Sequence, residues 1–120
     1  MSEMDKFLPD FDDILELLEE IKKLRLQKVL VDLNIKKKVS EVYKEVVIDS
    51  DYFINGKIPS AVYIKNTWEH TGFDDEILNL RVKLAHMSSE LAYLEAKFLT
   101  YRDMIDVWRT LSANERINIV

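Results

Sequence analysis

The chain of 120 residues is close to the usual size of one domain, and it carries a net charge of −5 with 48% hydrophobic and 32% charged residues. Its two glycines and two prolines are too few for the many turns of a β-sandwich or barrel, so the composition favours a helical chain. The absence of cysteine excludes disulfides, thiolate nucleophiles and sulfur-ligated metals.

The first residues, MSEMDKFLPDFDD, are acidic and lack the continuous apolar stretch of a secretory signal. No apolar run approaches the ~18 residues needed to span a bilayer. We therefore expect a cytoplasmic protein with no membrane partner.

We expect a first long helix over residues 11–47. Apolar residues recur there with a spacing of three or four, at Ile14, Leu17, Ile21, Leu24, Val31, Ile35, Val39, Val42 and Val46, with an interruption at Lys28. The alternative is a strand within residues 28–35, where apolar and polar residues also alternate. The charged flanking segments are good helix formers and favour the helix.

The segment 48–73 is expected to be a connector. Asn55-Gly56 is typical of a tight hairpin turn, which predicts a small β-hairpin, and Pro59 limits its second arm. Ser60 could instead cap a short helix that runs through Trp68. We expect a small hairpin or turn, followed by one or two helical turns. The connector aromatics are candidate docking residues for a protein partner or fill the end of a bundle: Tyr52, Phe53, Tyr63 and Trp68.

The clearest element is a second long helix over residues 74–112, with Asp74 as its expected N-cap. Its apolar residues alternate spacings of three and four without a break, as a coiled-coil seam does. This seam, which we expect to lie in the core or at an oligomer interface, comprises Ile77, Leu80, Leu84, Met87, Leu91, Leu94, Phe98, Tyr101, Ile105 and Trp108. The sequence thus predicts one mainly all-α domain over residues 1–120, a long antiparallel helical hairpin or coiled coil.

Charge is segregated near the N-terminus. Residues 1–20 carry eight acids and one base, whereas residues 21–40 carry seven bases and one acid. Such an arrangement suits antiparallel or staggered pairing between chains, or it presents a basic patch to a polyanion. The candidate polyanion contacts are Lys22, Lys23, Lys36, Lys37 and Lys38, although the acidic protein lacks aromatics clearly interleaved with them, so nucleic acid is not favoured.

No pattern of catalytic or cofactor-binding residues stands out. The two glycines stand alone, so no phosphate-binding loop is formed, and His70 and His86 lack the spacing of a metal site. The acids Asp74, Asp75 and Glu76 are explained by helix capping, His86 with Glu90 by a surface pair, and Asp103 with Asp106 by salt bridges. We therefore predict a protein that is not an enzyme and has no metal or other cofactor.

A lone hairpin of two such helices would leave Leu26, Val29, Leu33, Leu78, Val82 and Leu99 in water. Exposed apolar stripes of this kind indicate association. We predict a homo-oligomer, most simply a dimer that forms a four-helix bundle, and a non-catalytic assembly or adaptor function with a further, unidentified protein partner.

The layout of helix, short hairpin and helix resembles the beta subunit of prefoldin, with VYKEVVID (42–49) lying where that family enters its hairpin. The resemblance implies a holdase chaperone that binds unfolded clients. Because residues 63–71 have no counterpart in the family, it transfers no functional residue. A prefoldin-like holdase and a nucleic-acid accessory protein using Lys22–Lys38 are therefore the alternative functions.

Overall fold

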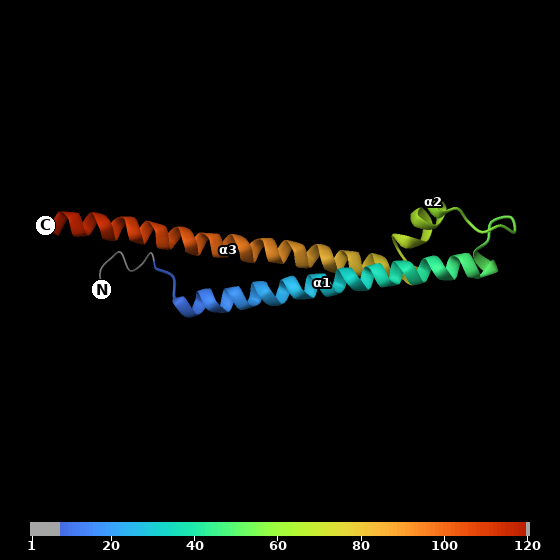
Figure 1. Cartoon of the computed structure of the whole chain (residues 1–120), viewed down its shortest axis with the longest axis horizontal. Helices are drawn as coiled ribbons and strands as arrows, with labels where there is room; N and C mark the ends of the chain where they lie inside the picture. Colours follow the sequence, from blue (N-terminus) through green and yellow to red (C-terminus); the bar gives the residue numbers. More distant parts are fainter. Residues whose placement is uncertain (1–7, 120) are drawn as a thin grey trace. The chain divides into compact units, whose positions relative to one another are not determined.

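The computed structural model describes residues 8–119, and this part of the chain is mainly helical and contains no strand. The all-α prediction is confirmed. Figure 1 shows the two long helices, α1 and α3, and the connector between them that contains the short helix α2. In chain order the elements are α1 (Phe11–Ile48), the 3₁₀ turn η2 (Ser50–Tyr52), α2 (Ala61–Ile64), the π-helical turn η3 (Lys65–Glu69), the 3₁₀ turn η4 (Phe73–Asp75) and α3 (Glu76–Ile119).

Helix α1 begins after a side-chain cap. The Asp10 carboxylate accepts a hydrogen bond from the amide of Asp12 at 2.9 Å, and the Asp10 carbonyl accepts one from the amide of Ile14 at 3.1 Å. These bonds satisfy amides that an isolated helix start would leave without partners. Residues 28–35 are helical, so α1 continues without a break through the stretch for which a strand was the alternative.

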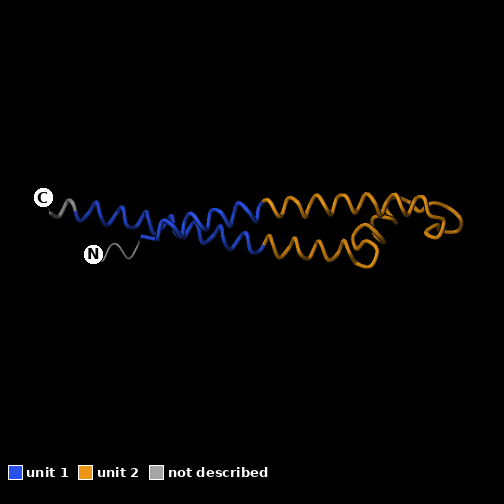
Figure 2. Tube along the Cα trace, turned by 90° about the horizontal axis from the view of Figure 1, so that it is seen from below, with its two compact units in different colours: residues 1–25, 89–120 blue, residues 26–88 orange. Residues whose placement is uncertain are grey.

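The chain divides into two compact units, shown in Figure 2. The described part of unit 1 comprises residues 8–25 and 89–119, and its segments of α1 and α3 lie side by side. Leu17, Ile21 and Leu24 of α1 are buried, and so are Leu91 and Leu94 of α3. A single apolar stripe from each helix therefore forms the core of this unit.

Unit 2 comprises residues 26–88 and has a wider core. Ile35, Val42 and Val46 of α1 form a buried cluster with Ile64 of α2 and Ile77 of α3. Val46, Ile64 and Ile77 are fully inaccessible to solvent. The connector thus closes this core by inserting Ile64 beside the two long helices.

The predicted seam of α3 faces inward in both units. Ile77, Met87, Leu91 and Leu94 are buried, and the other six predicted seam residues are half-buried. Leu78, Val82 and Leu99, which lie about a third of a turn or more from the seam, remain exposed. One face of α3 is therefore covered within the chain and a second apolar face is not.

The described residues of the connector form the turn that the sequence predicted, but they do not form a β-hairpin. Asn55 and Gly56 do form the expected tight turn with positive φ angles, and Ile54 and Lys57 exchange two backbone hydrogen bonds of 2.9 and 3.0 Å. The pairing stops at this single bridge. Pro59 has no amide to extend the ladder, and η2 precedes the other arm. The short helix predicted after Ser60 is present: the Ser60 hydroxyl accepts a hydrogen bond from the amide of Tyr63 and caps α2.

The start of α3 also differs from the sequence expectation. Asp74 lies inside η4 with a φ of 53°, and α3 begins at Glu76. At the start of α3 the amide of Glu76 donates to the Phe73 carbonyl, and the amides of Ile77 and Leu78 donate to the carbonyl oxygen of Thr71 at 2.9 and 3.0 Å. A backbone group thus does the capping that the sequence assigned to the Asp74 side chain.

Gly72 permits this junction through both its backbone and its size. Its φ is 71°, and a Cβ atom there would lie 2.7 Å from Cγ1 of the fully buried Ile77. Gly56 has a similar φ of 75°, but a Cβ atom there would meet nothing within 4 Å. Substitution of Gly56 therefore reports the cost of the positive φ alone, whereas substitution of Gly72 reports that cost together with the clash with Ile77.

We predict that Gly72→Ala destabilises the protein more than the matched control Gly56→Ala. The control should cost about 1–2 kcal/mol for placing alanine in a left-handed conformation. Gly72→Ala should cost about 1–3 kcal/mol more because the new methyl group forces Ile77 to move. Chemical denaturation followed by circular dichroism measures both values, and equal losses for the two variants would contradict the packing argument.

Candidate interaction surfaces

A group of exposed apolar residues in unit 2 lies on α1. Leu26, Val29, Leu30 and Leu33 are 60%, 55%, 56% and 55% exposed, respectively, and we name them the apolar patch. Their spacing of three and four places them on one side of the helix over about two turns. The core residues of α1 in this unit lie on its other side, which explains why α3 leaves the patch uncovered.

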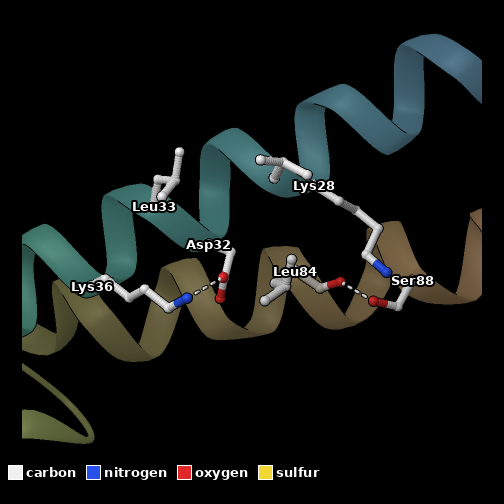
Figure 3. A pocket seen from close by; sticks show the side chains of 7 residues that line it. Lys28, Asp32, Leu33, Lys36, Leu84 and Ser88 are labelled. Atoms are coloured by element: carbon white, nitrogen blue, oxygen red, sulfur yellow. Dashed lines mark hydrogen bonds and ion pairs between the residues drawn. The ribbon is translucent and has the colours of Figure 1, made fainter.

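A groove of about 480 Å³ adjoins the apolar patch in unit 2. Figure 3 shows the residues that line it: Lys28, Val29, Asp32, Leu33 and Lys36 from α1, and Leu84 and Ser88 from α3. The Lys36 ammonium pairs with the Asp32 carboxylate at 3.1 Å, and the Ser88 hydroxyl donates to the Leu84 carbonyl at 2.9 Å. Asp32, Lys36 and Ser88 thus have partners, whereas the ammonium of Lys28 forms no ion pair with any described residue.

Unit 1 presents exposed apolar residues in an acidic setting. Phe11, Leu15 and Leu18 of α1 are exposed, and they alternate with exposed carboxylates that include Asp12 and Glu19. We name these five residues the acidic patch. The further acids of the N-terminal segment, Glu3 and Asp5, lie outside the described residues.

The lysines of the predicted basic band differ in whether they form ion pairs within the described chain. Lys36 pairs with Asp32, and the half-buried Lys38 pairs with Glu76 at 3.3 Å. Lys22, Lys23 and Lys37 are exposed and form no ion pair with any residue in the described part of the chain. The positive charge available for binding is therefore smaller than the sequence indicated.

The connector aromatics are divided between packing and exposure. Tyr52 and Trp68 are half-buried and lie 5.3 Å apart, and Phe73 contacts both rings at 5.4 and 5.6 Å between centroids. This three-ring cluster packs against the core of unit 2. Phe53 is half-buried as well, whereas Tyr63 is 42% exposed. Of the four predicted docking aromatics, Tyr63 is therefore the one that is exposed rather than half-buried.

Phe73 was missed as a partner of these rings. Phe73 directly precedes Asp74 and Asp75 in the sequence, and this position alone does not indicate a contact with the other two rings. Its position near both Tyr52 and Trp68 depends on how the connector returns to α3, which no local spacing specifies. An aromatic residue beside a helix start was the one available signal.

Neither a metal site nor a membrane-spanning helix is found among the described residues. Within residues 8–119, no three histidine or acidic side chains converge as a metal site would require. The described helices include none that is long and apolar enough to cross a membrane.

Comparison with protein-family models, curated proteins and solved structures gives no match to this chain. The prefoldin-like holdase function therefore stays a prediction from layout, and the hairpin on which that layout depended is reduced to a turn. Any function must be argued from the surfaces of the chain itself.

The environment of Tyr52 leads to a pH prediction. Burial raises the pKa of its hydroxyl above the ordinary value of 10.0, and the Asp49 and Glu45 carboxylates raise this pKa further. The neutral phenol is thus favoured in the folded state. Its contribution to stability is fully present below about pH 10 and is lost as the pH rises through the higher folded pKa.

We therefore predict that the free energy of unfolding falls less steeply above pH 10 in Tyr52→Phe than in the unmodified chain. Urea denaturation at a series of alkaline pH values tests this. Tyr63→Phe, at an exposed ring of the same connector, is the matched control. An identical alkaline loss in the Tyr52→Phe variant and the unmodified chain would show that Tyr52 does not contribute.

Proposed function

We propose that the protein is a non-catalytic assembly or adaptor protein that acts through protein–protein contacts of its helical faces. The observation that carries this proposal is the apolar patch, in which four aliphatic side chains on one side of α1 are each more than half exposed. Burying such side chains against a partner gains roughly 25 cal/mol per Å² of apolar surface, whereas leaving them in water favours non-specific association.

Self-association into a dimer is the simplest form of this function. Each chain offers exposed apolar residues on both long helices, including Leu78 and Val82 of α3 in unit 2. Two chains that each contribute two helices would form a four-helix bundle. The exposed faces that remain in such a dimer, together with Tyr63, would be available to a second protein.

We predict that light scattering coupled to gel filtration gives at least twice the mass of one chain at micromolar concentrations. Leu30→Glu, which places a charge in the apolar patch, should weaken association at least roughly tenfold because a charge would be buried at the interface. Val62→Glu is the matched control, since Val62 is 69% exposed on α2, outside the patch.

Both variants should keep their helical content, because each substitution is made at an exposed position. A stable monomer of the unmodified chain over the micromolar range would contradict self-assembly. An unaltered mass for Leu30→Glu would show that association uses another face.

A nucleic-acid accessory function is the second candidate. It is favoured by the exposure of Lys22, Lys23 and Lys37, whose ammonium groups make no ion pair within the described chain. A row of such lysines along a helix could contact the phosphates of a single strand. The pairing of Lys36 and Lys38 with carboxylates speaks against a large polyanion surface.

If this second function holds, fluorescence anisotropy should detect binding of a labelled single-stranded oligonucleotide at low salt. The logarithm of the affinity should fall with the logarithm of salt concentration by about 0.7 for each phosphate contacted. Reversing Lys22 and Lys23 to Glu should lower both the affinity and this slope, whereas the exposed Lys57→Glu in the connector turn is the control. No binding at low salt would eliminate the function.

A further inference from the structure

The charged residues beside the apolar patch follow a symmetric order along α1. Lys37 and Lys44 follow the patch toward the C-terminus of the helix, and Asp12 and Glu19 precede it. Asp12 and Lys44 are equally far from position 28, and the same is true of Glu19 and Lys37, and of Leu26 and Leu30. At these six positions the order of acidic, apolar and basic residues is therefore complementary to its own reverse, whereas other exposed charges of α1, namely Lys22, Lys23 and Glu41, do not follow it.

These positions share one side of the helix. Asp12, Glu19, Leu26 and Leu33 are separated by seven residues each, and so are Leu30, Lys37 and Lys44, which keeps each set on nearly one line of an α-helix. All seven side chains are exposed. Since α1 is one helix from Phe11 to Ile48, the order applies to a single continuous element.

The charges on this side have no partner in the described chain. Asp12, Glu19, Lys37 and Lys44 take part in none of the ion pairs formed within residues 8–119. The acids cannot reach the lysines within one chain because an uninterrupted helix holds them apart. A second helix that runs in the opposite direction can contact both groups at once.

We propose that the partner of the apolar patch is α1 of a second copy of this chain, packed antiparallel about position 28. In this arrangement the two apolar patches cover each other, Glu19 of each copy lies near Lys37 of the other, and Asp12 lies near Lys44. This inference rests on the proposed self-assembly and specifies its surface and direction. A parallel arrangement would place Glu19 beside Glu19 and Lys37 beside Lys37, which is repulsive.

The absence of cysteine permits a direct test of direction by disulfide trapping. Chains carrying Glu19→Cys and chains carrying Lys37→Cys are mixed and oxidised under mild conditions. Antiparallel packing should give mainly the mixed disulfide between positions 19 and 37. Gln27→Cys is the control, because the proposed packing places position 27 beside position 29 of the other copy, far along the helix from positions 19 and 37, so it should give little crosslinking with either partner.

Charge reversal tests the same arrangement at equilibrium by light scattering. Reversing Asp12 and Glu19 to Lys should raise the dimer dissociation constant roughly tenfold or more at low salt, and reversing Lys37 and Lys44 to Glu should do the same. A chain that carries all four reversals restores opposite charges across an antiparallel pair and should regain dimerisation. The differences should diminish at high salt.

The outcomes separate this inference from the function on which it rests. A monomeric unmodified chain would contradict both. A dimer that gives mainly 19–19 and 37–37 disulfides would overturn the antiparallel arrangement while leaving the assembly function in place. If neither the charge reversals nor Leu30→Glu changes the affinity of the dimer, α1 does not provide the interface.

Discussion

The structure depends on one constraint, which is that each long helix has more apolar positions than one neighbouring helix can cover. The stripe of α1 that includes Leu24 and Ile35 is buried, and the stripe of α3 that includes Ile77 and Leu91 packs within the same two units. A pair of helices buries only one such stripe on each member. The apolar residues on the other sides of α1 and α3 are therefore left exposed by the geometry of two-helix packing.

The long helices follow from local sequence, and the connector does not. The spacing of three and four residues identifies the inward positions of α3 because side chains at this spacing share one face of any helix. The connector depends on longer-range contacts, which have no periodic signal. Asn55-Gly56 specifies its turn correctly, but the extent of pairing around it depends on Pro59 and on where the chain must return.

The same difference applies to the candidate surfaces. The exposure of Leu26, Val29 and Leu33 could be anticipated, because the periodic seam is already occupied by other residues of α1. Which lysines remain unpaired could not be anticipated from the sequence, because this depends on which carboxylates lie within reach. Asp32, one turn away, pairs with Lys36, and Glu76, distant in sequence, pairs with Lys38. The Tyr52–Trp68–Phe73 cluster likewise joins residues from three separate segments, and its formation removes two of the four candidate docking rings from full exposure.

The segregation of charge along α1 has a physical consequence that uniform mixing would not have. Acids and bases at a spacing of four residues, such as Asp32 and Lys36, neutralise each other on the surface of one helix and carry no information about a partner. Glu19 and Lys37, which lie many turns apart on α1, cannot neutralise each other within one helix. Each exposed pair contributes little to affinity, but the arrangement penalises a parallel partner through like-charge contacts. Apolar burial would thus supply the driving force for association, and the order of charges would set its direction.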